Sequence, residues 1–388
     1  MMKKKIAILG STGSIGKSLL KIISRDKKNF KITLLSAKKN YKELLKQANN
    51  FDVKNIILTD KKFYKIAKNK TRYKKIKIYN NFNCFDKIYK NKIDYVMSSI
   101  VGLDGLRPTI NIIKHTKKIA IANKESIICG WNLILHELKK NKTQFVPVDS
   151  EHFSIWYAIK NTDVKEIDKI FITASGGSLL NVSKKKFRKL TLKKILKHPN
   201  WNMGKKITLD SSTLMNKVFE VIEAKKIFNL KYSQIEIIIH PNSYIHALIK
   251  YKNGMIKIIA HDTTMEIPIF NSIYENNSHK IKTNKINFKK LNNLNLNSVD
   301  KNKFILVKIL KKLPINNSLF ETLIVSANDS FVELFFRKKI NYVDMPIKLA
   351  KFINRTEFKK LKKILPRNIS EVIKLSDYVR NKIVTNDY

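Results

Sequence analysis

The stretch Lys5-Ile-Ala-Ile-Leu9, followed at once by Gly10-Ser-Thr-Gly-Ser-Ile-Gly16, decides the fold of this chain. The apolar run predicts a buried first strand, and the residues after the turn predict a helix that begins near Ile15. Glycines between a strand and a helix let backbone N–H groups approach a pyrophosphate. The spacing G-x-x-G-x-x-G differs from the commoner G-x-G-x-x-G, so the strand–turn–helix context carries the prediction of a dinucleotide site.

The same alternation of strand and helix continues to about residue 145. Short β-rich runs are separated in several places by amphipathic stretches, which is typical of βαβ units and a parallel sheet. We therefore predict an α/β protein whose residues 1–147 form a Rossmann-like NADPH-binding domain. The predicted strands are Lys5–Leu9, Lys31–Ser36, Asn55–Leu58, Tyr95–Ser98 and Lys118–Ile121.

The remaining chain has a different sequence pattern. Polar motifs and glycine pairs between strands such as Glu236–Ile239 and Met255–Ala260 predict a central α+β catalytic domain over residues 148–274. Residues 275–302 are rich in Asn, Lys and Ser and predict a linker. Helical periodicity over 303–388 predicts a C-terminal helical domain. Its expected helices are Phe304–Lys312, Leu319–Phe336 and Met345–Ile353.

The composition limits the classes of function. The formal net charge is +48, which invites a nucleic-acid interpretation. The lysines are spread along the chain, however, and an excess of Lys, Asn and Ile is what AT-rich codons produce. We favour that origin and expect no specific nucleic-acid partner. Cys84 and Cys129 match no metal spacing, and no apolar run approaches about 18 residues, so we expect a cytoplasmic protein without a membrane partner.

The end of the second predicted strand bears on the choice of cofactor. An NAD-specific site would place Asp or Glu there for the ribose hydroxyls. This chain instead has Lys38-Lys39-Asn40, with cations where a 2′-phosphate would lie. The pair favours NADP, although adjacent cations also arise by chance in so basic a chain.

Acidic side chains follow another strand end, at Asp149-Ser-Glu151-His152. Two residues apart in an extended segment, Asp149 and Glu151 would point to the same side and bind a hard divalent cation. Glu220 is the candidate third ligand, and Glu223 and His152 are the runners-up. The alternative is that these residues only cap a helix starting near Phe153.

A denser cluster runs from His198-Pro-Asn-Trp-Asn-Met-Gly204 through Asp210–Lys217 to Glu220. If Leu214, Met215 and the apolar residues after them form a helix, then Asn216, Lys217 and Glu220 share one face. The alternative is a capped helix with a solvated charge pair. Ser175 before two glycines is a reasonable phosphate nest. Ser175, Ser211, Asn216 and Lys217 together would suit a phosphomonoester, and Lys124 would stabilise an oxyanion.

In this order, the motifs resemble those of the 1-deoxy-D-xylulose 5-phosphate reductoisomerase family over nearly the whole chain. The matching segments are Gly10–Gly16, Ile100–Thr109, Ala122–Ser126, Pro147–His152, Thr173–Gly177, His198–Gly204, Asp210–Glu220, His240–Ser243, Ala327–Asp329 and Ile340–Asp344.

The resemblance implies a site, residue by residue. It implies Asp149, Glu151 and Glu220 as ligands of one divalent metal ion (Mn, Mg or Co), and Lys124, Glu151, Glu220 and His198 as catalytic residues. The implied substrate contacts are Lys124, Ser150, Glu151, Ser175, His198, Ser211, Asn216, Lys217 and Glu220. The implied NADPH contacts are Thr12, Gly13, Ser14, Ile15, Lys39, Asn40, Asn123, Glu125 and Gly204. We add Lys38 to them because its cation also follows the second predicted strand.

The resemblance also implies a reaction and an assembly. A phosphorylated ketose would be rearranged and then reduced by NADPH to 2-C-methyl-D-erythritol 4-phosphate, under a flap that contains Trp201 and Met203, in a homodimer. Lys38 stands where the family usually has glycine, Thr264-Met-Glu266 replaces Asp-Met-Arg, and Met255 replaces serine. The rival functions are a metal-free NADP-dependent semialdehyde-type dehydrogenase and a basic nucleic-acid-binding protein, neither of which needs three clustered carboxylates.

Overall fold

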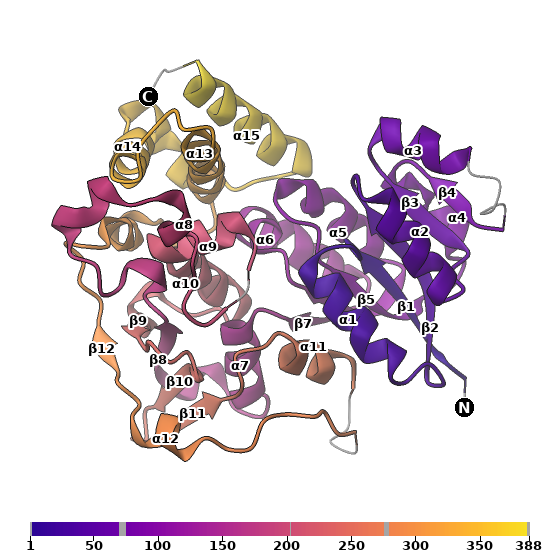
Figure 1. Ribbon diagram of the computed structural model, residues 1–388, viewed down its shortest axis with the longest axis horizontal. Coiled ribbons are helices and arrows are strands. Elements are labelled where there is room, and N and C mark those ends of the chain that lie inside the picture. Colours follow the sequence, from indigo (N-terminus) through magenta and orange to yellow (C-terminus); the bar gives the residue numbers. More distant parts are fainter. Residues whose placement is uncertain (1, 70–74, 202, 275–278, 386–388) are drawn as a thin grey trace. The chain divides into compact units, whose positions relative to one another are not determined.

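The computed structural model describes residues 2–69, 75–201, 203–274 and 279–385. The chain forms two compact units (Figure 1). The first unit comprises Met1–Ser126, Leu133–Asp149 and Met265–Ile281, and the second comprises Ile127–Asn132, Ser150–Thr264 and Lys282–Tyr388. The division into functional domains at residues 147, 274 and 302 stays a prediction.

The first unit is built on a parallel sheet of seven strands in the order β4-β3-β2-β1-β5-β6-β7. The five predicted strands are all present, and β4 and β7 form the two edges of the sheet. This sheet confirms the Rossmann-like prediction. The strands are β1 (Lys4–Leu9), β2 (Phe30–Ala37), β3 (Asn55–Leu58), β4 (Lys77–Tyr79), β5 (Ile93–Ser98), β6 (Thr116–Ile121) and β7 (Gln144–Pro147).

Helices connect these strands and bury one apolar side each. Helix α1 begins at Ser14, one residue before the expected position, and buries Leu19, Leu20, Ile22 and Ile23 in the core of the first unit. Because the strands are parallel, the residues that follow them gather at one edge of the sheet. The helices are α1 (Ser14–Ser24), α2 (Tyr41–Asn50), α3 (Lys61–Lys68), α4 (Phe85–Ile88), α5 (Leu106–Ile113) and α6 (Lys124–Lys140).

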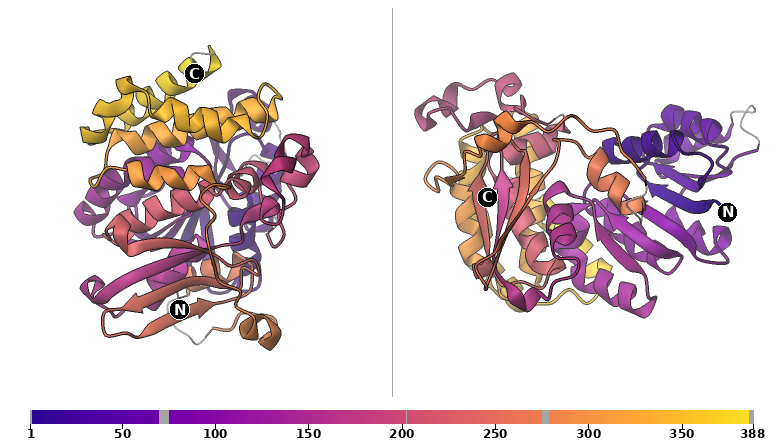
Figure 2. Two further views of the ribbon diagram at one scale, coloured as in Figure 1. Left: turned by 90° about the vertical axis from the view of Figure 1, so that its left-hand side faces the viewer. Right: turned by 90° about the horizontal axis from the view of Figure 1, so that it is seen from below.

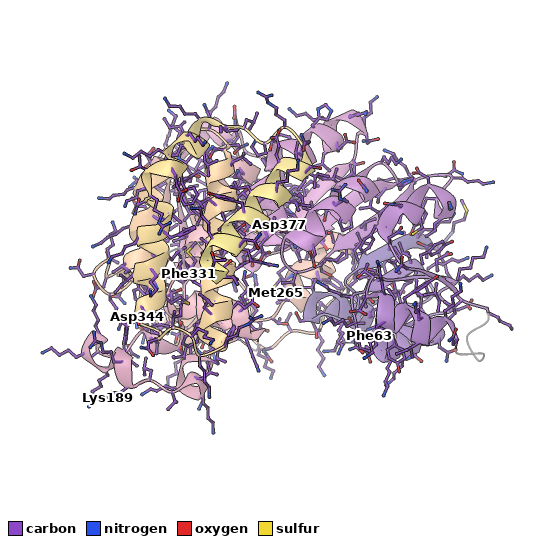
Figure 3. The ribbon with its side chains drawn as sticks, turned by 90° about the horizontal axis from the view of Figure 1, so that it is seen from above. Phe63, Lys189, Met265, Phe331, Asp344 and Asp377 are labelled. Atoms are coloured by element: carbon purple, nitrogen blue, oxygen red, sulfur yellow. The ribbon has the colours of Figure 1, made fainter. Side chains whose placement is uncertain are left out.

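A later segment returns to this unit. Helix α11 (Glu266–Ile273) packs against α1 and buries Ile269, Phe270 and Ile273 in the core of the parallel sheet, as the right-hand view of Figure 2 shows. Its Ser272 hydroxyl lies 2.7 Å from the hydroxyl of Tyr95 on β5. Met265, labelled in Figure 3, precedes the helix and packs on the same core.

The second unit contains a mixed sheet in the order β11-β10-β8-β9-β12. Only β8 and β9 run parallel, and the other neighbours are antiparallel. The predicted strands at Glu236–Ile239 and Met255–Ala260 correspond to β9 and β11. The strands are β8 (Ile167–Ala174), β9 (Ile235–Ile239), β10 (Ile245–Tyr251), β11 (Ile256–Ala260) and β12 (Asn297–Ser298).

Helices form the rest of the second unit (Figure 2, left). Helix α10 (Met215–Ile227) packs on β8 and β9, and α7 (Ser150–Ala158) packs on β10. The predicted C-terminal helices appear as α13 (Leu319–Phe336) and α14 (Asp344–Ile353), while Ile305–Lys312 is a 3-10 helix. Phe331, on α13, is fully buried in this layer (Figure 3). Shorter helices are α8 (Leu192–Ile195), α9 (Lys205–Ser212), α12 (Phe288–Asn292) and, at the C-terminus, α15 (Ile369–Val384).

Two local expectations are wrong. Helix α7 begins at Ser150 rather than near Phe153, so Glu151 lies in its first turn and not in an extended segment. Leu214 has a left-handed backbone (φ 59°) and separates α9 from α10, so the helix that carries Asn216 begins only at Met215.

Within the described part of residues 275–302, α12 forms and β12 pairs with β9. Among the described residues, no helix combines the length and apolarity that a membrane span requires.

Candidate functional site

The glycine turn after β1 has the shape that a phosphate cradle needs. Gly10 has φ +88°, and a Cβ there would come within 2.8 Å of the Ser99 carbonyl oxygen, so only glycine fits. Gly13 is the N-cap of α1 and has no side chain to bond the first N–H groups of the helix. Thr12 to Ile15 therefore surround a helix N-terminus suited to an anion.

The residues that follow β2 lie at the same edge of the sheet. Lys38 and Lys39 are exposed, and the Lys38 ammonium forms a 2.7 Å ion pair with Asp104. Asn40 caps α2, because its side chain accepts a hydrogen bond from the Glu43 N–H. The cations expected to meet a 2′-phosphate are thus solvent-accessible, and one of them already has a carboxylate partner.

Asn123, Lys124 and Glu125 follow β6. The Asn123 side chain caps α6 by accepting from the Ser126 N–H at 2.5 Å, and its amide donates to the carbonyls of Ile100 and Gly102. This network fixes the start of α6, of which Lys124 is the first residue. The Lys124 ammonium forms an ion pair with the Asp149 carboxylate in the same unit, and both side chains are mostly buried.

The densest group of charges lies between α7 and α10. The Lys217 ammonium bridges the carboxylates of Glu151 and Glu220, at 2.7 Å from Glu220, and all three side chains are buried. Asn216 donates to the other oxygen of Glu220. Burial alone would lower the pKa of Lys217, but the charges of Glu151 and Glu220 outweigh it, so the pKa is raised and the ammonium keeps its proton. The predicted shared face of Asn216, Lys217 and Glu220 is confirmed.

Among the residues that the structure describes, two groups of side chains have the composition of a metal site. The ligand atoms of Asp149, Glu151 and Glu220 lie within 4.8 Å of one another, and those of Asp149, His152 and Glu223 do so as well. Asp149 and Glu151 stay close because only Ser150 separates them along the chain. Three carboxylates suit a hard divalent cation such as Mg²⁺ or Mn²⁺, so the first group fits that metal better than the group containing a histidine.

His152 supports the first group instead. Its Nε2 lies 2.9 Å from the backbone carbonyl of Glu220, and its Nδ1 lies 3.9 Å from Glu223. The ring is 1% exposed, so it joins α7 to α10 inside the unit. A residue that was a runner-up ligand therefore holds together the two helices that carry Glu151 and Glu220.

Ser175 and His198 meet, as a shared phosphate site would require. The Ser175 hydroxyl lies 3.0 Å from His198 Nε2 and accepts from the Gly177 N–H at 3.1 Å. His198 Nδ1 accepts from the N–H groups of Asn200 and Trp201, so the proton of the neutral ring lies on Nε2. The turn also touches α9, because a Cβ on Gly177 would come within 2.6 Å of the Ser211 carbonyl oxygen.

Two predicted contacts use their hydroxyls locally. Ser211 donates to the Ile207 carbonyl at 2.9 Å within its own helix. The Ser150 hydroxyl donates to the Glu151 carboxylate at 2.6 Å. Both side chains are buried, and each hydroxyl oxygen keeps lone pairs that accept but do not donate.

The predicted flap is the described part of His198–Gly204; residue 202 lies outside the described residues. Asn200 anchors it by donating to the Pro241 carbonyl (2.5 Å) and to the Ser243 hydroxyl (2.8 Å). Trp201 packs edge-on against His246, with ring centroids 6.1 Å apart. Sequence reasoning treated His246 as structural and missed Asn200, and only the neighbouring Pro-Asn-Ser motif hinted at this anchor.

Two of the departures noted in the sequence, Glu266 and Met255, lie away from the candidate site. Glu266 pairs with Lys21 on α1 and lies 3.7 Å from Arg25, so it fixes α11 to the first unit. Met255 is 66% exposed next to β11. Neither residue belongs to the groups of charges described above.

The neutral state of His198 is testable. Burial, and then the charge of Lys217, lowers the pKa of His198 from 6.5 to about 4. Between pH 6.5 and 4 the unfolded chain therefore protonates this histidine while the folded chain keeps it neutral. Because the unfolded state binds the extra proton, the free energy of unfolding decreases as pH falls through that window. An NMR titration should show the Nε2–H tautomer at pH 7 and a midpoint near 4. A midpoint near 6.5 would contradict the buried geometry.

Comparisons with known proteins agree on one family. Residues 6–130 match the family model of 1-deoxy-D-xylulose 5-phosphate reductoisomerase, residues 145–228 match the model of its C-terminal domain, and residues 262–382 match a DXP reductoisomerase C-terminal domain model. The chain is 59% identical over 382 residues to the 1-deoxy-D-xylulose 5-phosphate reductoisomerase of Pelagibacter ubique, covering 98% of both chains.

Solved structures show the same likeness. The reductoisomerase of Zymomonas mobilis in complex with NADPH is 26% identical, with a TM-score of 0.87 and 98% coverage of both chains. A DOX-P reductoisomerase in complex with NADPH, fosmidomycin and magnesium is 29% identical, with a TM-score of 0.85 and coverage of 99% of this chain and 98% of that one.

Proposed function

This chain belongs to the 1-deoxy-D-xylulose 5-phosphate reductoisomerase family, and we propose that it converts that phosphorylated ketose to 2-C-methyl-D-erythritol 4-phosphate with NADPH and one divalent metal ion. The observation that carries the proposal is the group of Asp149, Glu151 and Glu220, whose ligand atoms lie within 4.8 Å of one another. The product enters isoprenoid precursor synthesis in the non-mevalonate route.

We assign the metal to these three carboxylates, and NADPH to the glycine turn together with Lys38, Lys39, Asn40, Asn123, Glu125 and Gly204. When bound, the metal polarises the oxygens of the substrate as a Lewis acid and NADPH supplies the reducing hydride. The oxygen-only donor set and the glycine-only turn at Gly10 support both assignments.

The residues of the chain position the substrate. His198 donates its Nε2–H to the Ser175 hydroxyl, and the O–H of Ser175 is the donor that this pair offers to a phosphate without adding a formal charge. Asn216 and Lys217 supply an amide and an ammonium from one helix face, and Ser211 lies on the helix that touches the Ser175 turn. Binding energy from the phosphate then orients the distant carbons that react.

Lys217 has two roles in this proposal, to compensate the charge of two carboxylates and to bind the phosphate. Two buried carboxylates need a compensating cation, and Lys217 provides that charge beside Glu151 and Glu220. A divalent ion held by Asp149, Glu151 and Glu220 would supply the same compensation, and the ammonium of Lys217 would then be available to the phosphate. Lys124 pairs with Asp149. In the proposed site it would stabilise an oxyanion.

The activity test is consumption of NADPH with 1-deoxy-D-xylulose 5-phosphate, with and without a chelator. Turnover should require a divalent ion. Glu220→Gln should keep the fold, because the amide has the same shape, and should lower kcat by about 100-fold or more, since a charged ligand is lost. Glu236→Gln, an exposed carboxylate in the same unit, is the matched control. Turnover that survives chelation, or a Glu220→Gln variant with native activity, would sink the metal assignment.

The cofactor assignment has a separate test. Lys39→Glu should raise the KM for NADPH by about tenfold or more, because a charge-assisted contact to the 2′-phosphate becomes repulsive. The KM for NADH, which lacks that phosphate, should change little. Lys46→Glu changes the net charge equally one turn into α2, where the side chain is also exposed. Equal losses with both nucleotides would point to misfolding instead.

We also propose that the chain forms a homodimer. Strand β11 is at the edge of its sheet, and its neighbour Met255 and its residues Ile256 and Ile258 are 66%, 56% and 46% exposed. An apolar edge strand invites pairing, and a second copy of the chain would cover it. Light scattering should give twice the chain mass of 45.2 kDa, and Ile258→Lys should reduce it. A native mass near that of one chain would refute the proposal. A cytoplasmic location stays a prediction.

A further inference from the structure

A β-bulge places two histidines on the same side of the mixed sheet. Ile245 pairs with Ala260 and Ala247 pairs with Ile259, which leaves His246 as an extra residue in β10. His261 follows β11 and continues the ladder, because its N–H donates to the Tyr244 carbonyl at 3.0 Å. Bulges redirect side chains, and here the redirected ring meets the ring of His261.

The two imidazoles form a stack that ends at the flap. The ring centroids of His246 and His261 are 3.7 Å apart and their planes differ by 12°. Trp201 packs edge-on against His246, with ring centroids 6.1 Å apart and planes that differ by 73°. We call Trp201, His246 and His261 the ring row.

Hydrogen bonds fix the orientation of both histidines. His261 Nδ1 lies 2.8 Å from the Asp262 carbonyl and so carries the proton, and His246 Nε2 donates to the His261 carbonyl at 3.2 Å. His261 Nε2 then faces the Ser154 hydroxyl at 3.5 Å. Ser154 belongs to α7, one turn after Glu151, so the ring row joins the helix of a proposed metal ligand to the flap.

Ordinary core packing would explain a buried His246 but not the whole arrangement. Trp201 is only partly buried and lies in a polar loop, so its ring needs a fixed apolar surface to dock on. His246 provides that surface, and it is held by its stack on the His261 ring and by its hydrogen bond to the His261 carbonyl. Burial, and then His261, lowers the pKa of His246 to about 3. Burial also lowers the pKa of His261, so both rings are neutral at pH 7.

We propose that His261 is a positioning residue for the flap, acting through His246 on Trp201; this inference rests on the proposed function. His261 sets the surface against which Trp201 closes, and closure excludes water and orients the substrate. Loss of the ring should therefore lower kcat and raise the KM for the phosphorylated ketose, with little effect on the KM for NADPH.

The first experiment compares three substitutions at residue 261. His261→Ala should lower kcat/KM for the ketose by about tenfold, because a loosely held flap misplaces the substrate. His261→Phe keeps a flat ring and should recover most of that loss. His261→Gln keeps hydrogen-bonding groups without a ring and should not. Native kcat/KM in His261→Ala, or better recovery by Gln than by Phe, would overturn the inference.

A double-mutant cycle separates positioning from general stability. If His261 acts only through Trp201, then adding His261→Ala to Trp201→Ala should cost less than about twofold in kcat/KM. A fully additive loss would overturn the inference. His115→Ala, which removes another buried, ring-contacting histidine in the first unit, is the control, and its effect should add independently of Trp201.

A readout without turnover distinguishes this inference from the proposed function. The emission of Trp201 is the difference between each protein and its Trp201→Phe counterpart. In His261→Ala this emission should shift to longer wavelength as the indole gains contact with water, and in His261→Phe it should not. An inactive native protein would refute the proposed function alone. An unshifted emission in His261→Ala would refute the inference that His261 positions Trp201.

Discussion

The shared ammonium of Lys217 is the interaction on which the site depends. Two carboxylates, Glu151 and Glu220, are buried from different helices, and neither could stay ionised there without a nearby positive charge. Lys217 supplies it, and the two acids in turn raise its pKa. The three groups therefore fix one another, and α7 is joined to α10. The three groups are thus already assembled, and in the proposed site a divalent cation bound by the two carboxylates would take the place of the ammonium.

The position of the helices near these groups depends on a backbone break and on contacts with α13. Leu214 breaks the chain between α9 and α10 with a left-handed backbone, so the two helices can present Ser211 and Lys217 separately. Helix α13 holds α9 in place, because Asn328 donates to Asp210 at 2.9 Å and Asp329 lies 2.9 Å from Lys206. The C-terminal helices thus act on the site through packing, without supplying any residue assigned to it.

Sequence reasoning predicted the parallel sheet, the glycine turn and the shared face of α10, because each depends on local periodicity or on chain order. It failed where distant packing decides. The return of α11 to the first unit depends on the burial of Ile269 and Ile273 against strands far away in sequence. Tertiary packing, and not local helix propensity, determines that α7 starts at Ser150 and that the helix breaks at Leu214. The stack of His246 on His261 depends on a bulge, for which a single sequence carries no signal.

The contrast between a net charge of +48 and an acidic site has a physical explanation. An added lysine on the surface costs little, because water solvates it and salt screens it. A carboxylate in the interior is different, since removing Glu321 would leave Lys226, 3.3 Å away and 2% exposed, as a buried charge without compensation. Surface positions can therefore be replaced by lysine through compositional drift, whereas the buried carboxylates are retained. The basic surface and the acidic interior are separate consequences of solvation. Of the exposed cations, only Lys38 and Lys39 are assigned to the reaction, through the cofactor.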